Sequence, residues 1–136
     1  MSPGNIEPGS PDEWLARAKS SLLVAQQPKP EAAYWEDHCF LAQQAAEKAL
    51  KAVLIARSLP FPRTHDLGLL LDPMPGDLEI PSKVHEAVRL SELATTARYP
   101  GDYPLIEEEE WKEAVGLARA VVSWAAEVLA ERGPKE

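Results

Sequence analysis

Thirteen prolines divide this chain into segments that can form uninterrupted helices. Proline lacks a backbone N–H and its ring clashes with the preceding turn, so it breaks helix interiors but is tolerated in a first turn. The prolines stand at positions 3, 8, 11, 28, 30, 60, 62, 73, 75, 81, 100, 104 and 134. The longer proline-free spans between them are therefore the expected helices.

Apolar residues recur within these spans at the period of an amphipathic α-helix. The spacing predicts five helices, at about residues 11–26, 31–58, 65–71, 82–98 and 106–132. Ser10, Thr64 and Ser82 are the expected N-caps of the first, third and fourth helices. No segment alternates polar and apolar residues over a sustained length, so no sheet is expected. Because short connections favour antiparallel neighbours, the predicted fold is all-α, a four- to five-helix up-and-down antiparallel bundle.

The last predicted helix carries two neighbouring apolar stripes. One keeps heptad a/d spacing and contains Trp111, Val115, Ala118, Val122, Ala125 and Leu129. The other contains Ala114, Leu117, Val121, Trp124 and Val128. Such a face is wider than one neighbouring helix needs, so it indicates either a central position in the bundle or a helix from a second subunit. Left exposed in a monomer, it would be a liability.

Composition limits the classes of function that need to be considered. The length of 136 residues suits one domain, expected at residues 11–132 between a flexible tail at 1–10 and a C-terminal tail at 133–136. The net charge of −8 argues against sequence-independent binding of RNA or DNA, because phosphate neutralisation dominates such affinity. A single cysteine, Cys39, fits a reducing compartment. The chain shows neither a signal peptide nor an apolar run of roughly 20 residues, so a cytoplasmic protein without a membrane segment is expected.

The sequence predicts neither a metal site nor a cofactor. His38, His65 and His85 lack the spacing of metal ligands, and no glycine-rich phosphate-binding loop is present. The four consecutive glutamates at 107–110 are interpreted as the N-terminal residues of the last helix, where negative charge is favoured. In the second predicted helix, Glu47 and Lys51 form an i,i+4 pair that is expected on the outer, solvent-facing side.

Residues 63–66 form the first of two candidate anion-binding segments. One interpretation is a capped turn, in which Thr64 and Asp66 accept hydrogen bonds from backbone amides. The other is an anion site made by Arg63, His65 and the amides at the helix start. Capping alone accounts for two of the four residues, so the capped turn is the favoured interpretation.

Residues 97–104 form the second candidate segment, a loop bracketed by prolines. Its arginine, Arg98, suits a phosphate or carboxylate, and its tyrosines, Tyr99 and Tyr103, suit stacking on a base or hydrogen bonding. Asp102 lies between them in the same loop. The alternative interpretation is a helix C-terminus, with Arg98 on the last carbonyls and the tyrosines closing the edge of the core. The two interpretations are evenly balanced.

The residues from His38 to Leu71, together with those from Leu90 to Pro104, resemble the HEPN family. The most specific pieces are QQAAEKALKA, FPRTHDL and ARYP, and the similarity spans about Trp14 to Glu131. The resemblance implies a four- or five-helix bundle that forms a homodimer with a cleft at the dimer interface. It also implies, for many stand-alone members, a minimal nucleotidyltransferase partner, often in a toxin–antitoxin pair.

Some HEPN members cut RNA without a metal, through an arginine followed after four to six residues by a histidine. Arg98 stands at the position of that arginine, but no histidine follows it, and Tyr103 occupies the first position the histidine could take. Tyrosine, with an ordinary pKa near 10, is a poor proton shuttle at neutral pH. The resemblance therefore implies a protein that binds a nucleotide or a nucleotidyltransferase and has no catalytic residue. The predicted ligand-binding residues are Arg98, Tyr99, Asp102, Tyr103, Arg63 and His65. The alternatives are a metal-independent ribonuclease toxin using Arg98 and a purely structural interaction module.

Overall fold

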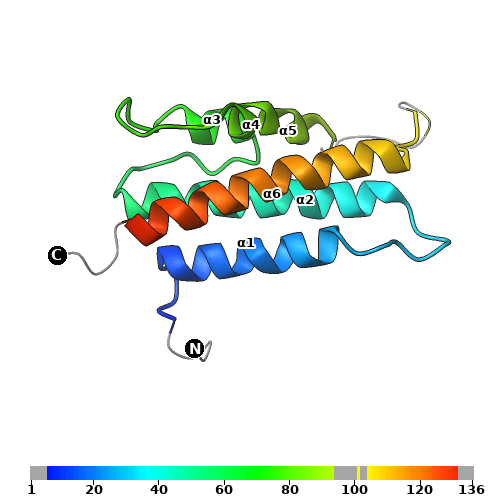
Figure 1. The fold of residues 1–136 in the computed structure, drawn as a ribbon, viewed down its shortest axis with the longest axis horizontal. Helices are drawn as coiled ribbons and strands as arrows, with labels where there is room; N and C mark the ends of the chain where they lie inside the picture. The colour runs from blue at the N-terminus through cyan, green and yellow to red at the C-terminus, as the bar shows by residue number, and fades with distance from the viewer. Residues whose placement is uncertain (1–5, 94–100, 102–103, 132–136) are drawn as a thin grey trace.

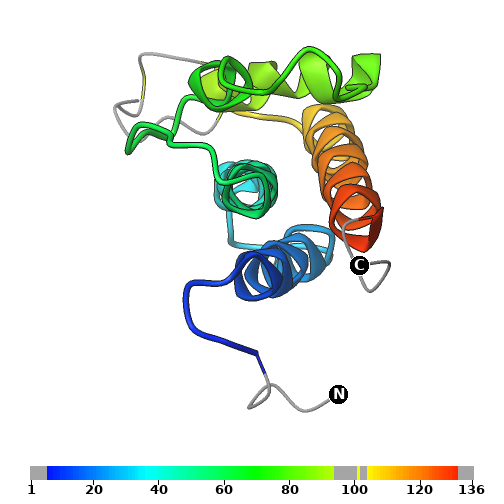
Figure 2. The same ribbon diagram turned by 90° about the vertical axis from the view of Figure 1, so that its left-hand side faces the viewer.

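A computed structural model of the chain describes residues 6–93, 101 and 104–131. Three long helices, α1 (Pro11–Ala25), α2 (Trp35–Ala56) and α6 (Glu108–Glu131), pack against one another. The short helices α3 (Leu67–Leu71), α4 (Ser82–Glu86) and α5 (Leu90–Leu93) form a layer over α2 and α6, as Figures 1 and 2 show. The described residues contain no strand, and the prediction of an all-α bundle is confirmed.

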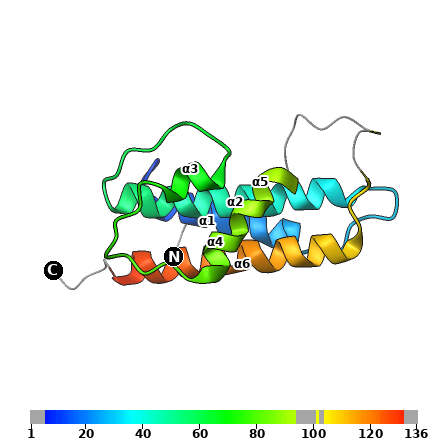
Figure 3. The same cartoon turned by 90° about the horizontal axis from the view of Figure 1, so that it is seen from above.

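The chain reverses direction between successive parts of the bundle, which are α1, α2, the stretch from α3 to α5, and α6 (Figure 1). In that view, α1 and the stretch from α3 to α5 run one way, whereas α2 and α6 run the other way. Beside the three long helices, the stretch of short helices from α3 to α5 takes the place of a fourth long helix. Seen from above, in Figure 3, this stretch crosses over α2 and α6.

Two helix starts follow their local sequence closely. At the start of α1, the Ser10 hydroxyl accepts a hydrogen bond from the amide of Glu13 at 3.2 Å, which confirms Ser10 as the N-cap. At the start of α6, the amide of Glu107 donates to Glu110 Oε1 at 2.9 Å. The first turn of α6 is acidic, so the predicted role of the glutamate run at the helix start is confirmed.

The third and fourth helices differ from their predicted spans. The N-cap of α3 is Asp66, whose Oδ1 accepts from the amide of Gly68 at 2.9 Å. The prediction of Thr64 as N-cap was wrong, because its hydroxyl accepts from the Asp66 amide at 3.0 Å and closes the turn before the helix. The prediction of Ser82 as N-cap was also wrong, since Pro81 holds that position and makes no side-chain cap.

The predicted fourth helix is divided into three pieces. A short 3₁₀ segment, Ala87–Arg89, separates α4 from α5, so the stretch has a tighter turn in its middle. The remainder of the predicted span, residues 94–98, lies outside the described residues.

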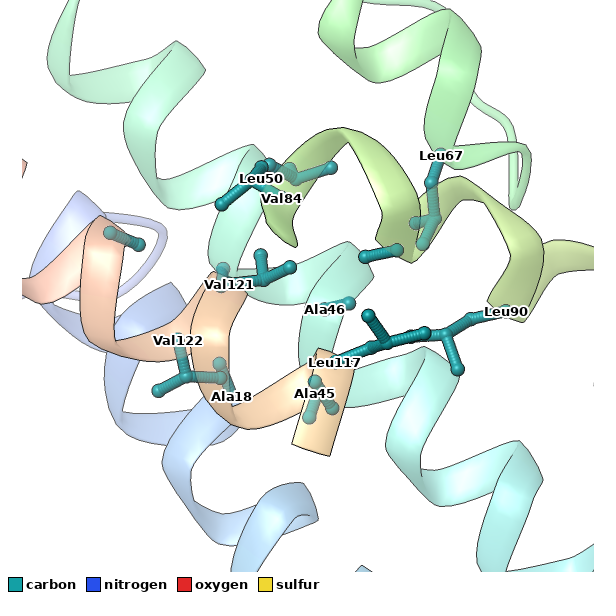
Figure 4. Close-up of a cluster of buried hydrophobic side chains, with 14 of the residues drawn as sticks. Ala18, Ala45, Ala46, Leu50, Leu67, Val84, Leu90, Leu117, Val121 and Val122 are labelled. Atoms are coloured by element: carbon teal, nitrogen blue, oxygen red, sulfur yellow. The ribbon is translucent and has the colours of Figure 1, made fainter. Parts of the chain in front are cut away.

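Both apolar stripes of α6 are covered within one chain. Every member of the two stripes is buried except Trp111, which is partly buried. Figure 4 shows Leu117, Val121 and Val122 of α6 directed toward the core, with Ala45 and Ala46 of α2 close by. Because α6 packs on α1, α2 and α4, its wide face reflects a central position and does not require a second subunit.

Within the described residues, no helix combines the length and the apolar character that crossing a membrane requires.

Candidate functional site

A buried carboxylate lies at the centre of the most extensive polar network in α2. The residue is Glu47, which is only 4% exposed. Its Oε1 accepts from Gln43 Nε2 at 3.1 Å and from Gln44 Nε2 at 3.3 Å, and it lies 2.9 Å from His65 Nδ1. Its Oε2 accepts from Lys51 Nζ at 2.8 Å. Burying a carboxylate is costly without such partners, so this network is a condition for placing Glu47 inside the bundle.

The same network holds the turn before α3 against α2. Gln43 Nε2 also donates to the backbone carbonyl of His65 at 2.8 Å, and Gln43 Oε1 accepts from Gln44 Nε2 at 2.9 Å. His65 is thus bonded to α2 through both its main chain and its ring. The position of the His65 ring is therefore fixed from two sides.

Lys51 completes the network from the opposite side of the carboxylate. Its ammonium lies 5.6 Å from the ring centroid of Trp14 in α1 and 5.9 Å from that of Phe61 in the connection between α2 and α3. The predicted Glu47–Lys51 pair does form, but the two side chains are only 6% and 12% exposed. Its predicted place on the outer side of the helix was wrong, because α1 and the α2–α3 connection cover this side of α2.

The network keeps Glu47 charged. Burial alone would raise the pKa of the Glu47 carboxyl, but hydrogen bonds from Lys51, His65 and Gln43 outweigh burial. The pKa of Glu47 consequently lies below its ordinary value of 4.5, and the group is a carboxylate at neutral pH. An ionised carboxylate only accepts hydrogen bonds, so every group bonded to it must donate.

His65 is the member of the network that reaches the surface. Its side chain is 82% exposed even though Nδ1 is bonded to the buried carboxylate. Arg63, two residues earlier, is exposed as well. Since Thr64 and Asp66 make the turn and the cap, residues 63–66 form the predicted capped turn and also present Arg63 and His65 at the surface.

The sequence interpretation missed Gln43, Glu47 and Lys51 as partners of His65. The missed signal lies in the stripe that Gln43 and Glu47 share with Leu50 and Leu54, which are buried. Polar residues that continue an apolar stripe at helical spacing indicate buried groups that need polar partners.

The second candidate segment lies mostly outside the described residues. Arg98, Tyr99, Asp102 and Tyr103 all belong to this part, so their assignment to a ligand stays a prediction. The chain is anchored shortly after them, where the amide of Ile106 donates to Glu36 Oε2 at 3.2 Å.

An aromatic cluster fixes the same end of the bundle. The rings of Trp35 and Trp111 stack with their centroids 4.3 Å apart, and Lys29 Nζ lies 5.3 Å from the Trp35 ring. Trp111 Nε1 donates to the carbonyl of Ala25 at 2.7 Å, and the His38 ring lies edge-on to Trp35 at 5.9 Å. This cluster therefore joins the start of α6 to the end of α1 and the start of α2.

Within the described part of the chain, no three His, Cys, Asp or Glu side chains are grouped so that they could hold a metal ion.

Comparison with known proteins gives one family and two solved structures. The family model for the HEPN domain matches residues 11–129. The crystal structure of TT1696 from Thermus thermophilus is 32% identical, with a TM-score of 0.72 over 87% of this chain and 97% of that one. The crystal structure of ST0689, described as an archaeal HEPN homologue, is 25% identical, with a TM-score of 0.68 over 87% of this chain and 96% of that one. No curated protein matches the chain.

Proposed function

Because this chain belongs to the HEPN domain family, as its sequence resemblance predicted, we propose that it is a cytoplasmic nucleotide-binding protein that forms a homodimer. We further propose that it pairs with a nucleotidyltransferase, as one half of a toxin–antitoxin unit. The ligand-binding residues in this proposal are Arg98, Tyr99, Asp102, Tyr103, Arg63 and His65.

The observation that supports a ligand site most strongly is the exposed His65 ring on a buried, charged partner. Most exposed side chains gain no fixed position, because ordering them costs conformational entropy. His65 is held by Glu47 and Gln43 and is nevertheless 82% exposed. With Arg63 exposed two residues away, the turn offers a guanidinium and an oriented imidazole to an anionic ligand.

The dimer and the partner are supported by family membership alone. The wide apolar face of α6 no longer supports a dimer, because that face is covered within one chain. Sedimentation tests the dimer directly. A monomeric mass at micromolar concentration would count decisively against it. Co-purification with a minimal nucleotidyltransferase would support the pairing.

Nucleotide binding is tested by the melting temperature in the presence of millimolar ATP, GTP, CTP or UTP. At least one of them is expected to raise the melting temperature of the native protein. Arg98→Ala and Arg63→Ala should each weaken that effect without unfolding the bundle. Arg89→Ala is the matched control, because Arg89 is also exposed but is paired with Glu113 of α6. If none of the four nucleotides shifts the melting temperature, the proposal is wrong and a structural interaction module becomes the better account.

A further inference from the structure

The hydrogen bonds around Glu47 determine which nitrogen of His65 carries a proton. Among the described residues, the His65 ring bonds to Glu47 alone, and the contact is to Nδ1 at 2.9 Å. A carboxylate has no proton to donate, so Nδ1 must be the donor in this bond. In the neutral imidazole only one nitrogen is protonated. Nε2 therefore keeps its lone pair.

Four partners surround the carboxylate. Gln43, Gln44 and His65 share Oε1, and Lys51 contacts Oε2. Gln43, Gln44 and Lys51 all reach Glu47 as donors. They hold the group as a carboxylate, which has no proton to donate to the ring.

The free nitrogen belongs to a ring that solvent can reach. The His65 side chain is 82% exposed and its Nδ1 is bonded to Glu47, so Nε2 is the ring nitrogen left for a ligand. An unprotonated Nε2 accepts hydrogen bonds and repels a phosphate oxygen, which is also an acceptor. In the neutral ring, His65 thus selects for a hydroxyl or amino group, whereas Arg63 suits a phosphate.

We propose that His65 Nε2 is a subsite for a ribose hydroxyl of the bound nucleotide, with Arg63 contacting the phosphate. This inference rests on the proposed nucleotide-binding function and adds the part of the nucleotide that His65 recognises. The ribose is the group next to the phosphate in every nucleotide, and Arg63 and His65 are two residues apart in the chain. The acceptor character of Nε2 makes the subsite favour ribonucleotides over nucleotides that lack the sugar hydroxyls.

Two measurements on the full-length protein at pH 8.5 test the subsite. The first is the nitrogen-15 spectrum of the histidine side chains, in which His65 should show the Nδ1–H tautomer. The second is calorimetric titration with ATP and with 2′,3′-dideoxy-ATP, where about a 3- to 10-fold preference for ATP is expected for one net hydrogen bond. His65→Ala should bind both ligands equally, and His85→Ala, at another exposed histidine, should keep the preference.

A Glu47→Gln variant tests whether the ribose preference depends on the Nδ1–H tautomer or only on the presence of the His65 ring. A glutamine amide can donate to Nδ1, which allows the proton to move to Nε2. An Nε2–H donates to a phosphate oxygen of either ligand as well as to a hydroxyl, so this variant should show a smaller ribose preference while it retains His65. An Nε2–H tautomer in the native protein would overturn the inference whatever the binding data show. Binding of both ligands with equal affinity would overturn the inference alone, whereas failure of ATP and the other ribonucleotides to bind would overturn the proposed function together with it.

Discussion

Replacing Glu47 with glutamine should destabilise the protein far more than a matched change at the surface. The substitution keeps the shape of the side chain but removes the charge from a residue that is 4% exposed. Lys51 then loses its carboxylate partner at 2.8 Å, and His65 loses the charged acceptor that its Nδ1 contacts at 2.9 Å. One carboxylate oxygen would become an NH₂ group, which only donates. That NH₂ group would face either the Lys51 ammonium or the side-chain amides of Gln43 and Gln44, which are donors as well.

The expected loss in the free energy of unfolding is about 2–3 kcal/mol. Breaking a fully buried ion pair costs about 3–5 kcal/mol because the remaining charge is stranded. The cost should be lower here, since Lys51 is 12% exposed and keeps its contacts with the rings of Trp14 and Phe61. For a chain of this size, that loss lowers the melting temperature by about 6–12 °C.

Glu113→Gln is the matched control for this prediction. Glu113 and Arg89 lie 2.9 Å apart, much like Glu47 and Lys51, but their side chains are 50% and 60% exposed. An exposed pair contributes about 0–1 kcal/mol. Urea unfolding of the three proteins at pH 7 compares the two sites. Equal losses for the two variants, or a Glu47→Gln protein as stable as the native one, would refute the argument from burial.

Four further outcomes are expected. The folded pKa of Glu47 lies below its ordinary value of 4.5, so its stabilisation is fully present above that value and is lost as the pH falls through the folded pKa. The difference in stability between the native protein and Glu47→Gln, measured by urea unfolding, should therefore shrink as the pH is lowered below 4.5. Ser10→Ala removes the N-cap bond of α1 and should cost about 1 kcal/mol in thermal or urea unfolding, while Ser10→Gly should cost only a few tenths. Trp111→Phe loses a 2.7 Å hydrogen bond to an α1 carbonyl and should cost about 1–2 kcal/mol, with no loss expected if that bond is absent in solution. The purified protein should not cleave single-stranded RNA or tRNA, since Arg98 cannot exchange protons at neutral pH; cleavage that vanishes in both Arg98→Ala and His65→Ala would restore the ribonuclease alternative.

The features predicted correctly from the sequence are those decided by neighbouring residues. Proline positions bounded the helices, and Ser10 and the glutamates at 107–110 mark helix starts because a cap bonds an amide within three residues. The choice between Thr64 and Asp66 failed because both residues can accept a bond from an amide two residues ahead, and both do. Which of the two residues is the N-cap depends on where the helical backbone begins, and the local sequence does not decide that.

The features that were missed depend on segments distant in the chain. Glu47 and Lys51 have the spacing of an ordinary surface pair, and only the return of Phe61 and His65 over α2 buries them. The apolar stripes of α6 likewise gave two alternatives, since a sequence does not show how many neighbours surround a helix. The candidate site was half predicted: the surface residue His65 was chosen, but the buried carboxylate that orients it was not.

Nuclear magnetic resonance of the His65 ring during titration with ATP shows whether the Glu47 network orients His65 for contact with a ligand. ATP should shift the Nε2 resonance of His65 while Nδ1 stays protonated and bonded to Glu47, and His85 should remain unchanged. ATP binding that leaves the His65 ring unaffected would show that His65 is not part of the ligand site. A His65 ring that is not bonded to Glu47 before ATP is added would show that Glu47 does not orient it.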